Sequence, residues 1–154
     1  MLTALLLVSG LATINSIPMS LDIRQRENEG ILILDLKGRL ISGEAVQKLR
    51  DTIRALLDSG RNNILLNLKG VDYVDSSGLG ALVICYTSAK KEGGAVKLLH
   101  LNRRNIELLV LTKLTTVFEL FNEEQDAINS FFPSREIKRF DILSFLQKQE
   151  ESGD

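Results

Sequence analysis

Hydrophobic and polar positions recur along this chain with two periods, and these periods predict strands and helices in turn. Residues 21–27 alternate apolar and polar as an edge strand does, and residues 31–36 follow after a turn, so the pair reads as a hairpin. Residues 64–68 are almost uninterrupted apolar sequence, which is typical of a strand covered on both faces. The remaining predicted strands are residues 95–101 and 117–120.

Helical spacing of apolar residues occurs between these strands. Residues 44–59 place apolar side chains at intervals of three and four and end at Gly60, a residue type that commonly terminates helices. A second helix follows residue 75 and runs to Lys91, before Gly93 and Gly94. Two shorter helices are predicted at residues 103–111 and 123–132. This order predicts an α/β fold with an open, largely parallel sheet and right-handed crossovers.

The two ends of the chain lie outside this pattern. Residues 1–12 are apolar, but no Lys or Arg precedes them and the run is too short to span a bilayer. We therefore interpret residues 1–18 as a start-site artefact, with Met19 as the biological start; a poor signal peptide or a membrane-touching segment is the alternative. Residues 19–132 would then form the domain. Residues 133–154 are a C-terminal extension, predicted to be partly helical, that lies on the domain, binds a partner or forms a homodimer.

Composition excludes several classes of function. The chain has 154 residues, 44% of them hydrophobic and 25% charged, which suits one globular domain with one core. A net charge of −1 argues against nucleic-acid binding through clustered basic residues. Cys85 is the only cysteine and His100 the only histidine, so an intrachain disulfide, a cysteine-cluster metal site and a zinc site of histidines are excluded. We expect neither a metal nor a cofactor, and Cys85 is interpreted as a small core residue.

The richest chemistry lies in residues 71–83, where Asp75-Ser76-Ser77-Gly78 separates the buried strand from the following helix. The start of a helix has unpaired backbone N–H groups and the positive end of the dipole, so it favours an anion. Asp and Ser are also preferred helix caps, each contributing about 1 kcal/mol. A serine here can therefore be a cap, or it can carry a phosphate of about two negative charges. The local chemistry leaves both interpretations open.

With its flanks, residues 67–80, this motif resembles the STAS domain family, and residues 91–94 and 105–111 also fit; the resemblance covers residues 20–132. It implies a single STAS-like α/β domain whose mixed sheet has four or five strands, with helices packed mainly on one side. The likeness is greatest to the stand-alone bacterial anti-sigma factor antagonists, which implies a cytoplasmic protein without nucleic-acid or membrane partners.

The resemblance also implies a phosphorylation cycle. The position that matches the family's phosphoacceptor is Ser76, and the phosphate would come from an anti-sigma factor that is also a protein kinase. The unmodified antagonist would bind that factor and free a sigma factor. Phosphorylation would end the binding, and a PP2C-type phosphatase would restore it. The implied partner-binding residues are Asp75, Ser77, Gly78, Leu79, Gly80, Arg39 and Ser42.

Two other functions compete with this one. Many such antagonists carry Asp after a Gly-x-Leu pattern in the loop after the second strand, whereas this chain has Ile41 there. A STAS module of a lipid-transport or sensory complex, in which Ser76 only caps the helix, is therefore an alternative. A hydrolase using Ser76 or Ser77 would need His100, but the Gly-x-Ser-x-Gly setting is missing, so we predict no enzymatic activity. The motif glycines allow either close partner approach or tight local packing.

Overall fold

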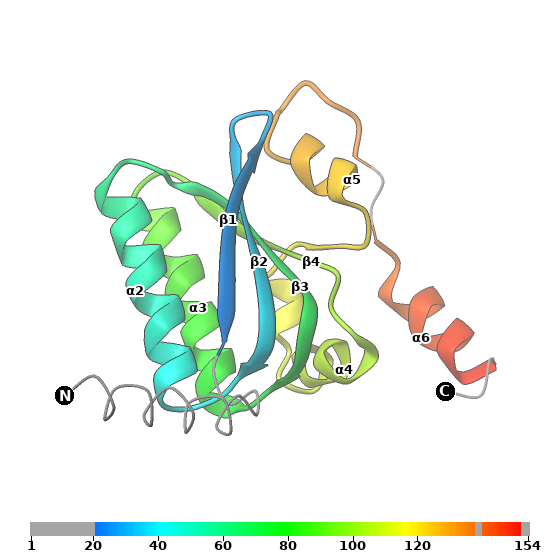
Figure 1. Ribbon diagram of the computed structural model, residues 1–154. Helices are drawn as coiled ribbons and strands as arrows, with labels where there is room; N and C mark the ends of the chain where they lie inside the picture. The colour runs from blue at the N-terminus through cyan, green and yellow to red at the C-terminus, as the bar shows by residue number, and fades with distance from the viewer. Residues whose placement is uncertain (1–20, 138–139, 152–154) are drawn as a thin grey trace, which may run out of the picture.

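The computed structural model describes residues 21–137 and 140–151, so the predicted leader at residues 1–18 lies outside the described residues (Figure 1). Its sheet contains β1 (Asp22–Asn28), β2 (Ile31–Leu40), β3 (Asn63–Val74), β4 (Ala95–Leu99) and β5 (Leu120–Phe121). Its helices are α2 (Glu44–Asp58), α3 (Ser76–Lys91), α4 (Arg103–Leu111), α5 (Glu124–Asn129) and α6 (Ile142–Glu151), with a short 3-10 helix, η1, at Leu114–Thr116.

The five strands lie in the sheet in the same order as in the chain, β1-β2-β3-β4-β5. β1 is antiparallel to β2, and the other neighbours are parallel. A right-handed crossover places its helix on the same face whenever the chain steps in the same direction. Accordingly, α2, α3 and α4 share one hydrophobic cluster with one face of the sheet, and α5 lies against the opposite face (Figure 1). The predicted mixed sheet with helices mainly on one side is confirmed.

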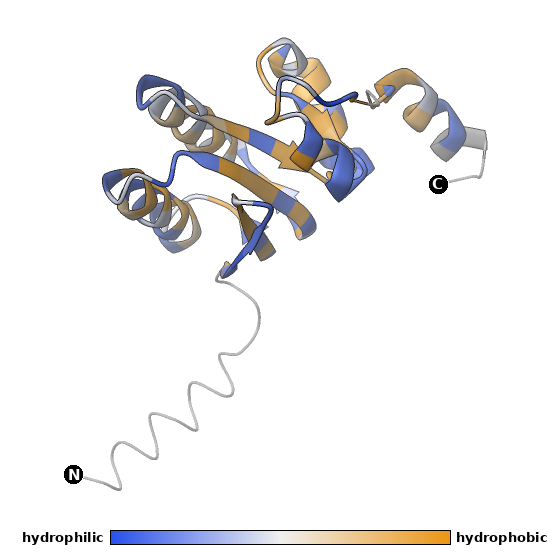
Figure 2. Ribbon diagram, turned by 90° about the horizontal axis from the view of Figure 1, so that it is seen from above, coloured by the Kyte–Doolittle hydropathy of each residue, from blue (hydrophilic) through white to orange (hydrophobic). Residues whose placement is uncertain are grey.

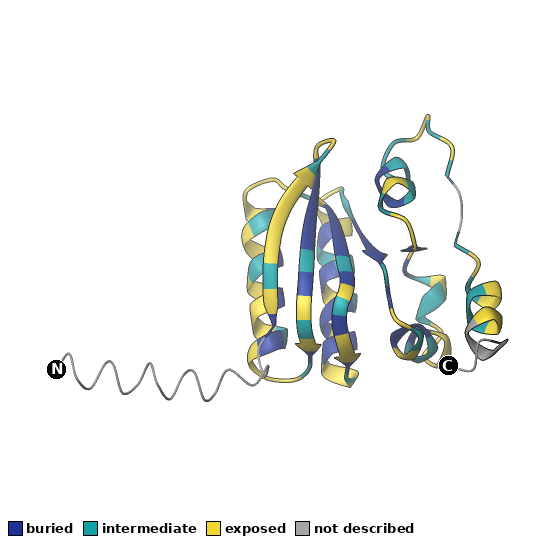
Figure 3. Cartoon of the chain, turned by 45° about the vertical axis from the view of Figure 1, so that its right-hand side comes forward, coloured by how far each residue is buried: buried dark blue, intermediate teal, exposed yellow. Residues whose placement is uncertain are grey.

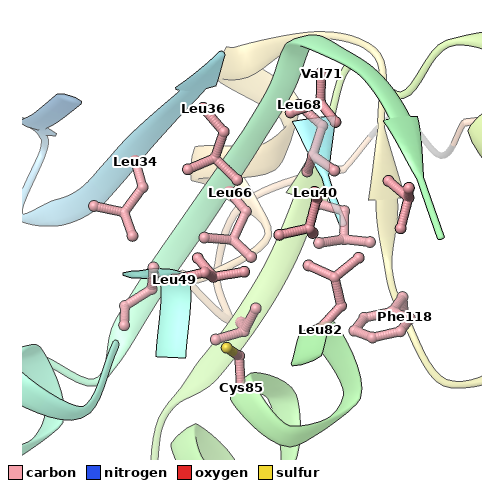
Figure 4. Packing of buried hydrophobic residues seen from close by; sticks show 14 of the residues in the cluster. Leu34, Leu36, Leu40, Leu49, Leu66, Leu68, Val71, Leu82, Cys85 and Phe118 are labelled. Atoms are coloured by element: carbon pink, nitrogen blue, oxygen red, sulfur yellow. The ribbon is translucent and has the colours of Figure 1, made fainter. Parts of the chain in front are cut away.

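The main core lies between the sheet and helices α2, α3 and α4. Leu34, Leu66 and Leu98 come from three adjacent strands and are fully buried there. Figure 4 shows Leu34 and Leu66 together with Cys85, which is also a core residue. The central strands are hydrophobic along much of their length, whereas the helices alternate hydrophobic and hydrophilic residues (Figure 2). β1 lies at the edge of the sheet, as predicted, and it is mostly exposed (Figure 3). A smaller cluster beneath α5 includes Ile33 on the other face of the sheet.

Strands β2 and β3 are longer than the sequence predicts. The strand predicted at residues 31–36 continues to Leu40, so Arg39 lies on β2 and not in the loop after it. Gly38 has φ 121, and register shifts between β2 and β3 on either side of it let the two strands stay paired. A glycine that reads as a turn is here a strand irregularity. β3 likewise passes through Gly70 and ends one residue before Asp75.

The C-terminal third differs from the prediction in its boundaries. The strand expected at residues 117–120 is the two-residue β5, because η1 and the buried Phe118 occupy the preceding segment. The helix expected at residues 123–132 stops at Asn129. The C-terminal extension is partly helical, since α6 begins at Ile142. Before it, Ile137 packs on the smaller cluster and Phe140 packs on the main core, so these two side chains contact opposite faces of the sheet.

Two features are absent from residues 21–137 and 140–151. None of the helices in these ranges has the length and apolar composition that a membrane crossing requires. The same residues contain no group of three or more His, Cys, Asp or Glu side chains placed to hold a metal ion.

Candidate functional site

Asp75 is the residue that caps helix α3. Its backbone is extended, and its Oδ1 accepts a hydrogen bond from the backbone N–H of Gly78 at 2.7 Å. This is the usual geometry of an N-cap, which satisfies one of the free N–H groups at the start of a helix. Ser76 is therefore the first residue of the helix and not its cap. Of the two interpretations left open by the sequence, capping belongs to Asp75.

The same carboxylate also holds the loop after β2. Asp75 Oδ2 accepts a hydrogen bond from the backbone N–H of Ser42 at 3.0 Å, and the backbone N–H of Asp75 donates to the carbonyl of Leu40 at 3.2 Å. Partial burial raises the pKa of the Asp75 carboxyl, but the N–H groups of Ser42, Gly78 and Ser77 together lower it below its ordinary value. Asp75 is therefore ionised at neutral pH, and the backbone N–H groups stabilise its negative charge.

The two glycines of the motif play different parts. A Cβ on Gly78 would overlap the carbonyl oxygen of Leu40 and lie 2.9 Å from its carbonyl carbon. Helix α3 can approach the end of β2 this closely only because Gly78 has no side chain. At Gly80, in contrast, a Cβ would meet nothing within 4 Å, and the residue is exposed. Tight packing thus explains why position 78 is a glycine, whereas local packing does not explain the glycine at position 80.

Ser76 and Ser77 are both exposed at the start of α3. Among the described residues, neither hydroxyl has a hydrogen-bond partner. Arg39 and Ser42 are also exposed, whereas Gly78 and Leu79 are buried. His100 makes no hydrogen bond to either serine within the described residues. Burial and nearby Lys69 lower the pKa of His100, against the opposing effect of Glu123 and Glu124.

A hollow of about 290 Å³ lies beside Ser76, and the sequence analysis missed it. It is lined by Tyr73, Val74, Asp75, Ser76, Arg104, Asn105, Glu107, Leu108 and Leu111. Its rim includes large apolar side chains in contact with water, since Tyr73 is 39% exposed and Leu111 is 80% exposed. The only signal in the sequence is that α3 and α4 both follow parallel strands. Their N-termini therefore meet at one edge of the sheet.

The N-terminus of α4 is fixed to the end of β3 by two asparagines. Asn102 caps α4 by accepting from the N–H of Asn105 at 2.8 Å, and its amide donates to the carbonyls of Val71 and Asp72 at 3.3 and 3.1 Å. The buried amide of Asn105 also donates to Val71, at 3.2 Å. These bonds attach α4 to the strand that leads directly into the Asp75 motif.

The motif and its surroundings match a known family. The sequence model of the STAS domain matches residues 22–127, which is more than half of the chain. The chain belongs to the STAS domain family. This STAS domain is followed by residues beyond the matched segment, which include helix α6.

Two relatives of this STAS domain are named anti-sigma factor antagonists. It is 28% identical over 110 residues to the anti-sigma-B factor antagonist of Bacillus subtilis (strain 168), covering 71% of this chain and 99% of the relative. It is also 28% identical over 115 residues to an anti-sigma F factor antagonist of Paenibacillus polymyxa, covering 71% of this chain and 94% of that protein. A crystal structure of an anti-sigma factor antagonist from Mycobacterium paratuberculosis has the same fold, with a TM-score of 0.65 and 21% identity over 74% of this chain and 96% of that one.

Proposed function

We propose that this STAS domain is an anti-sigma factor antagonist and that Ser76 is its phosphoacceptor. In its unmodified form it binds an anti-sigma factor that is also a serine kinase, and a sigma factor is freed. Phosphorylation of Ser76 ends the binding, and a PP2C-type phosphatase reverses it. This cycle would take place in the cytoplasm. Relatives named anti-sigma factor antagonists, aligned over nearly their whole length, support the proposal.

The observation that carries the proposal is that Asp75, and not Ser76, caps helix α3. Because Asp75 provides the cap, the Ser76 hydroxyl is exposed and uncommitted at the positive end of α3. A phosphate there would be tolerated by the helix, so the fold would remain while the surface changes its charge. Placing that charge in an interface is costly because water must be removed from it, and this cost would account for release without a change of fold.

The partner would contact the surface around Ser76. Its exposed members are Ser77, Gly80, Arg39 and Ser42. Asp75 would act by holding the loop after β2 against the start of α3. Gly78 and Leu79 are buried, so their part would be to set the shape of this surface.

The test compares the wild-type chain with Ser76→Ala, Ser77→Ala and Ser76→Asp, each expressed in the native cell. Intact mass and peptide mapping should show one phosphate at position 76 in the wild type and in Ser77→Ala, and none in Ser76→Ala. Each variant is then incubated with ATP and the serine kinase that copurifies with Ser76→Ala. Ser76→Asp should bind that kinase more weakly than Ser76→Ala, because it places a charge on the interface.

A second candidate is a STAS module of another complex that does not switch by phosphorylation. It is favoured by Ile41, which stands where many antagonists carry an aspartate. No phosphate on any serine in the native cell, together with no copurifying kinase, would favour this module. Phosphate on Ser77 alone would keep the switch but overturn the assignment to Ser76.

A further inference from the structure

One cation lines the hollow beside Ser76, and it has no carboxylate partner among the described residues. The guanidinium of Arg104 lies over the ring of Tyr73, 5.7 Å from its centroid. The acidic groups of the hollow are engaged elsewhere: Asp75 accepts two backbone N–H groups, and Glu107 Oε1 accepts from Arg103 Nε at 2.7 Å. The positive charge of Arg104 is therefore the one that an anion placed in this hollow would meet.

We infer that Arg104 is the internal counter-ion of a phosphate on Ser76. The inference rests on the proposed phosphorylation and adds the residue that receives the modified side chain. In the phosphorylated protein, the guanidinium leaves the face of Tyr73 and pairs with the phosphate across the hollow. The phosphate is thereby held between the N-termini of α3 and α4.

The position of Arg104 is fixed by the fold. It is the second residue of α4, whose N-terminus is held to β3 by Asn102 and Asn105. Tyr73, over which the guanidinium lies, is three residues before Ser76 and lines the same hollow. Arg104 and Ser76 therefore line one hollow, each from the N-terminus of a helix.

The energies favour this movement. A cation over an aromatic ring is attracted only weakly when the ring is exposed to water. Tyr73 is 39% exposed, so its contact with Arg104 is of this weak kind. Hydrogen bonds between a guanidinium and a phosphate are charge-assisted, often bidentate and roughly twice as strong as neutral ones. A phosphate of about two negative charges within reach would therefore attract the guanidinium away from the ring.

Arg39 provides a matched control. It is an exposed arginine on β2 and is the register partner of Tyr73 on β3. It does not line the hollow that contains Ser76 and Arg104. If the overall positive charge near the motif set the pKa of the phosphate, removing either arginine would change that pKa equally.

The experiment places phosphoserine at position 76 of the full chain by genetic encoding, so it needs neither the kinase nor the partner. Phosphorus NMR then follows the second ionisation of the phosphate with pH in the wild type, Arg104→Gln, Arg104→Lys and Arg39→Gln. A nearby cation favours the dianion and lowers the phosphate pKa from its ordinary value near 6. We expect Arg104→Gln to raise this pKa by roughly half a unit or more, Arg104→Lys to raise it less, and Arg39→Gln to leave it unchanged.

The Nε resonance of Arg104 gives a second measurement on the unmutated protein. It should shift when the phosphate becomes a dianion, and added salt should reduce that shift. An equal phosphate pKa in the wild type and Arg104→Gln would overturn the inference, because the helix N-termini alone would then account for the site. An effect of Arg39→Gln alone would overturn it in favour of Arg39. Either result would leave the proposed phosphorylation itself untouched.

Discussion

Gly78 lies against the backbone of Leu40 so closely that a Cβ on Gly78 would overlap the carbonyl oxygen of Leu40. Backbone cannot move aside as the end of a flexible side chain can, so Gly78→Ala must displace the start of α3. We expect it to lower the free energy of unfolding by about 1–3 kcal/mol. Gly80→Ala is the matched control in the same helix. It meets nothing within 4 Å and should be neutral or stabilising by up to about 1 kcal/mol.

Urea unfolding of the two variants and the wild type measures this difference. Equal stability of Gly78→Ala and Gly80→Ala would contradict the close packing of α3 on β2.

The carboxylate of Asp75 should make stability depend on pH. The pKa of Asp75 is lower in the folded protein than in the unfolded chain. Its contribution to the free energy of unfolding is therefore complete above the ordinary carboxyl pKa, and it is lost as the pH falls through the pKa of the folded protein. Asp75→Ala should cost about 0.5–2 kcal/mol at pH 7, and the cost should shrink as the pH approaches 3. Asp72→Ala, an exposed substitution three residues earlier, should have little effect.

Thermal unfolding between pH 7 and pH 3 tests this prediction. A constant difference between Asp75→Ala and the wild type across that range would show that the charge of Asp75 does not stabilise the fold.

Lys97 is a buried lysine, and we expect its side chain to stabilise the fold. It is only 7% exposed, and its ammonium group donates to the carbonyl and hydroxyl of Ser130 at 2.9 and 3.0 Å. It also pairs with Glu119 at 2.9 Å. Lys97→Met keeps the apolar stem but removes these bonds, so we expect a loss of about 1–3 kcal/mol. Lys90→Met, at an exposed site on α3, should change stability little, and equal midpoints of chemical unfolding for the two variants would refute the prediction.

The domain boundaries can be tested by truncation. A chain of residues 19–154 should unfold as cooperatively as the full chain and at the same temperature, because the strand pattern begins at Leu21. A chain of residues 19–137 should also fold but melt at a lower temperature. It loses Phe140, Phe145 and Leu146, which pack on the main core. Calorimetry compares the three chains, and non-cooperative unfolding of residues 19–154 would contradict the interpretation of residues 1–18 as an artefact.

The hydrophobic pattern of the sequence determined the fold class, because it is local information. Burial on one face repeats at fixed intervals along each element, so the apolar run at Ile64 predicted a buried strand and the spacing after Asp75 predicted a helix. The STAS resemblance rested on the same local stretch. Strand ends were less accurate, since Gly38 signals a turn in isolation but lies within β2. Its register with β3 depends on residues far away in the chain.

Only the tertiary structure decided which motif residue does what. Asp75 and not Ser76 caps α3, and the carboxylate of Asp75 also accepts from the backbone N–H of Ser42, which lies 33 residues earlier. The hollow with Arg104 forms because the N-termini of α3 and α4 follow neighbouring parallel strands and so reach the same edge of the sheet. Hydrogen bonds and close approaches between distant segments have no periodic signature in the sequence. They exist only once the sheet has set the distances between those segments.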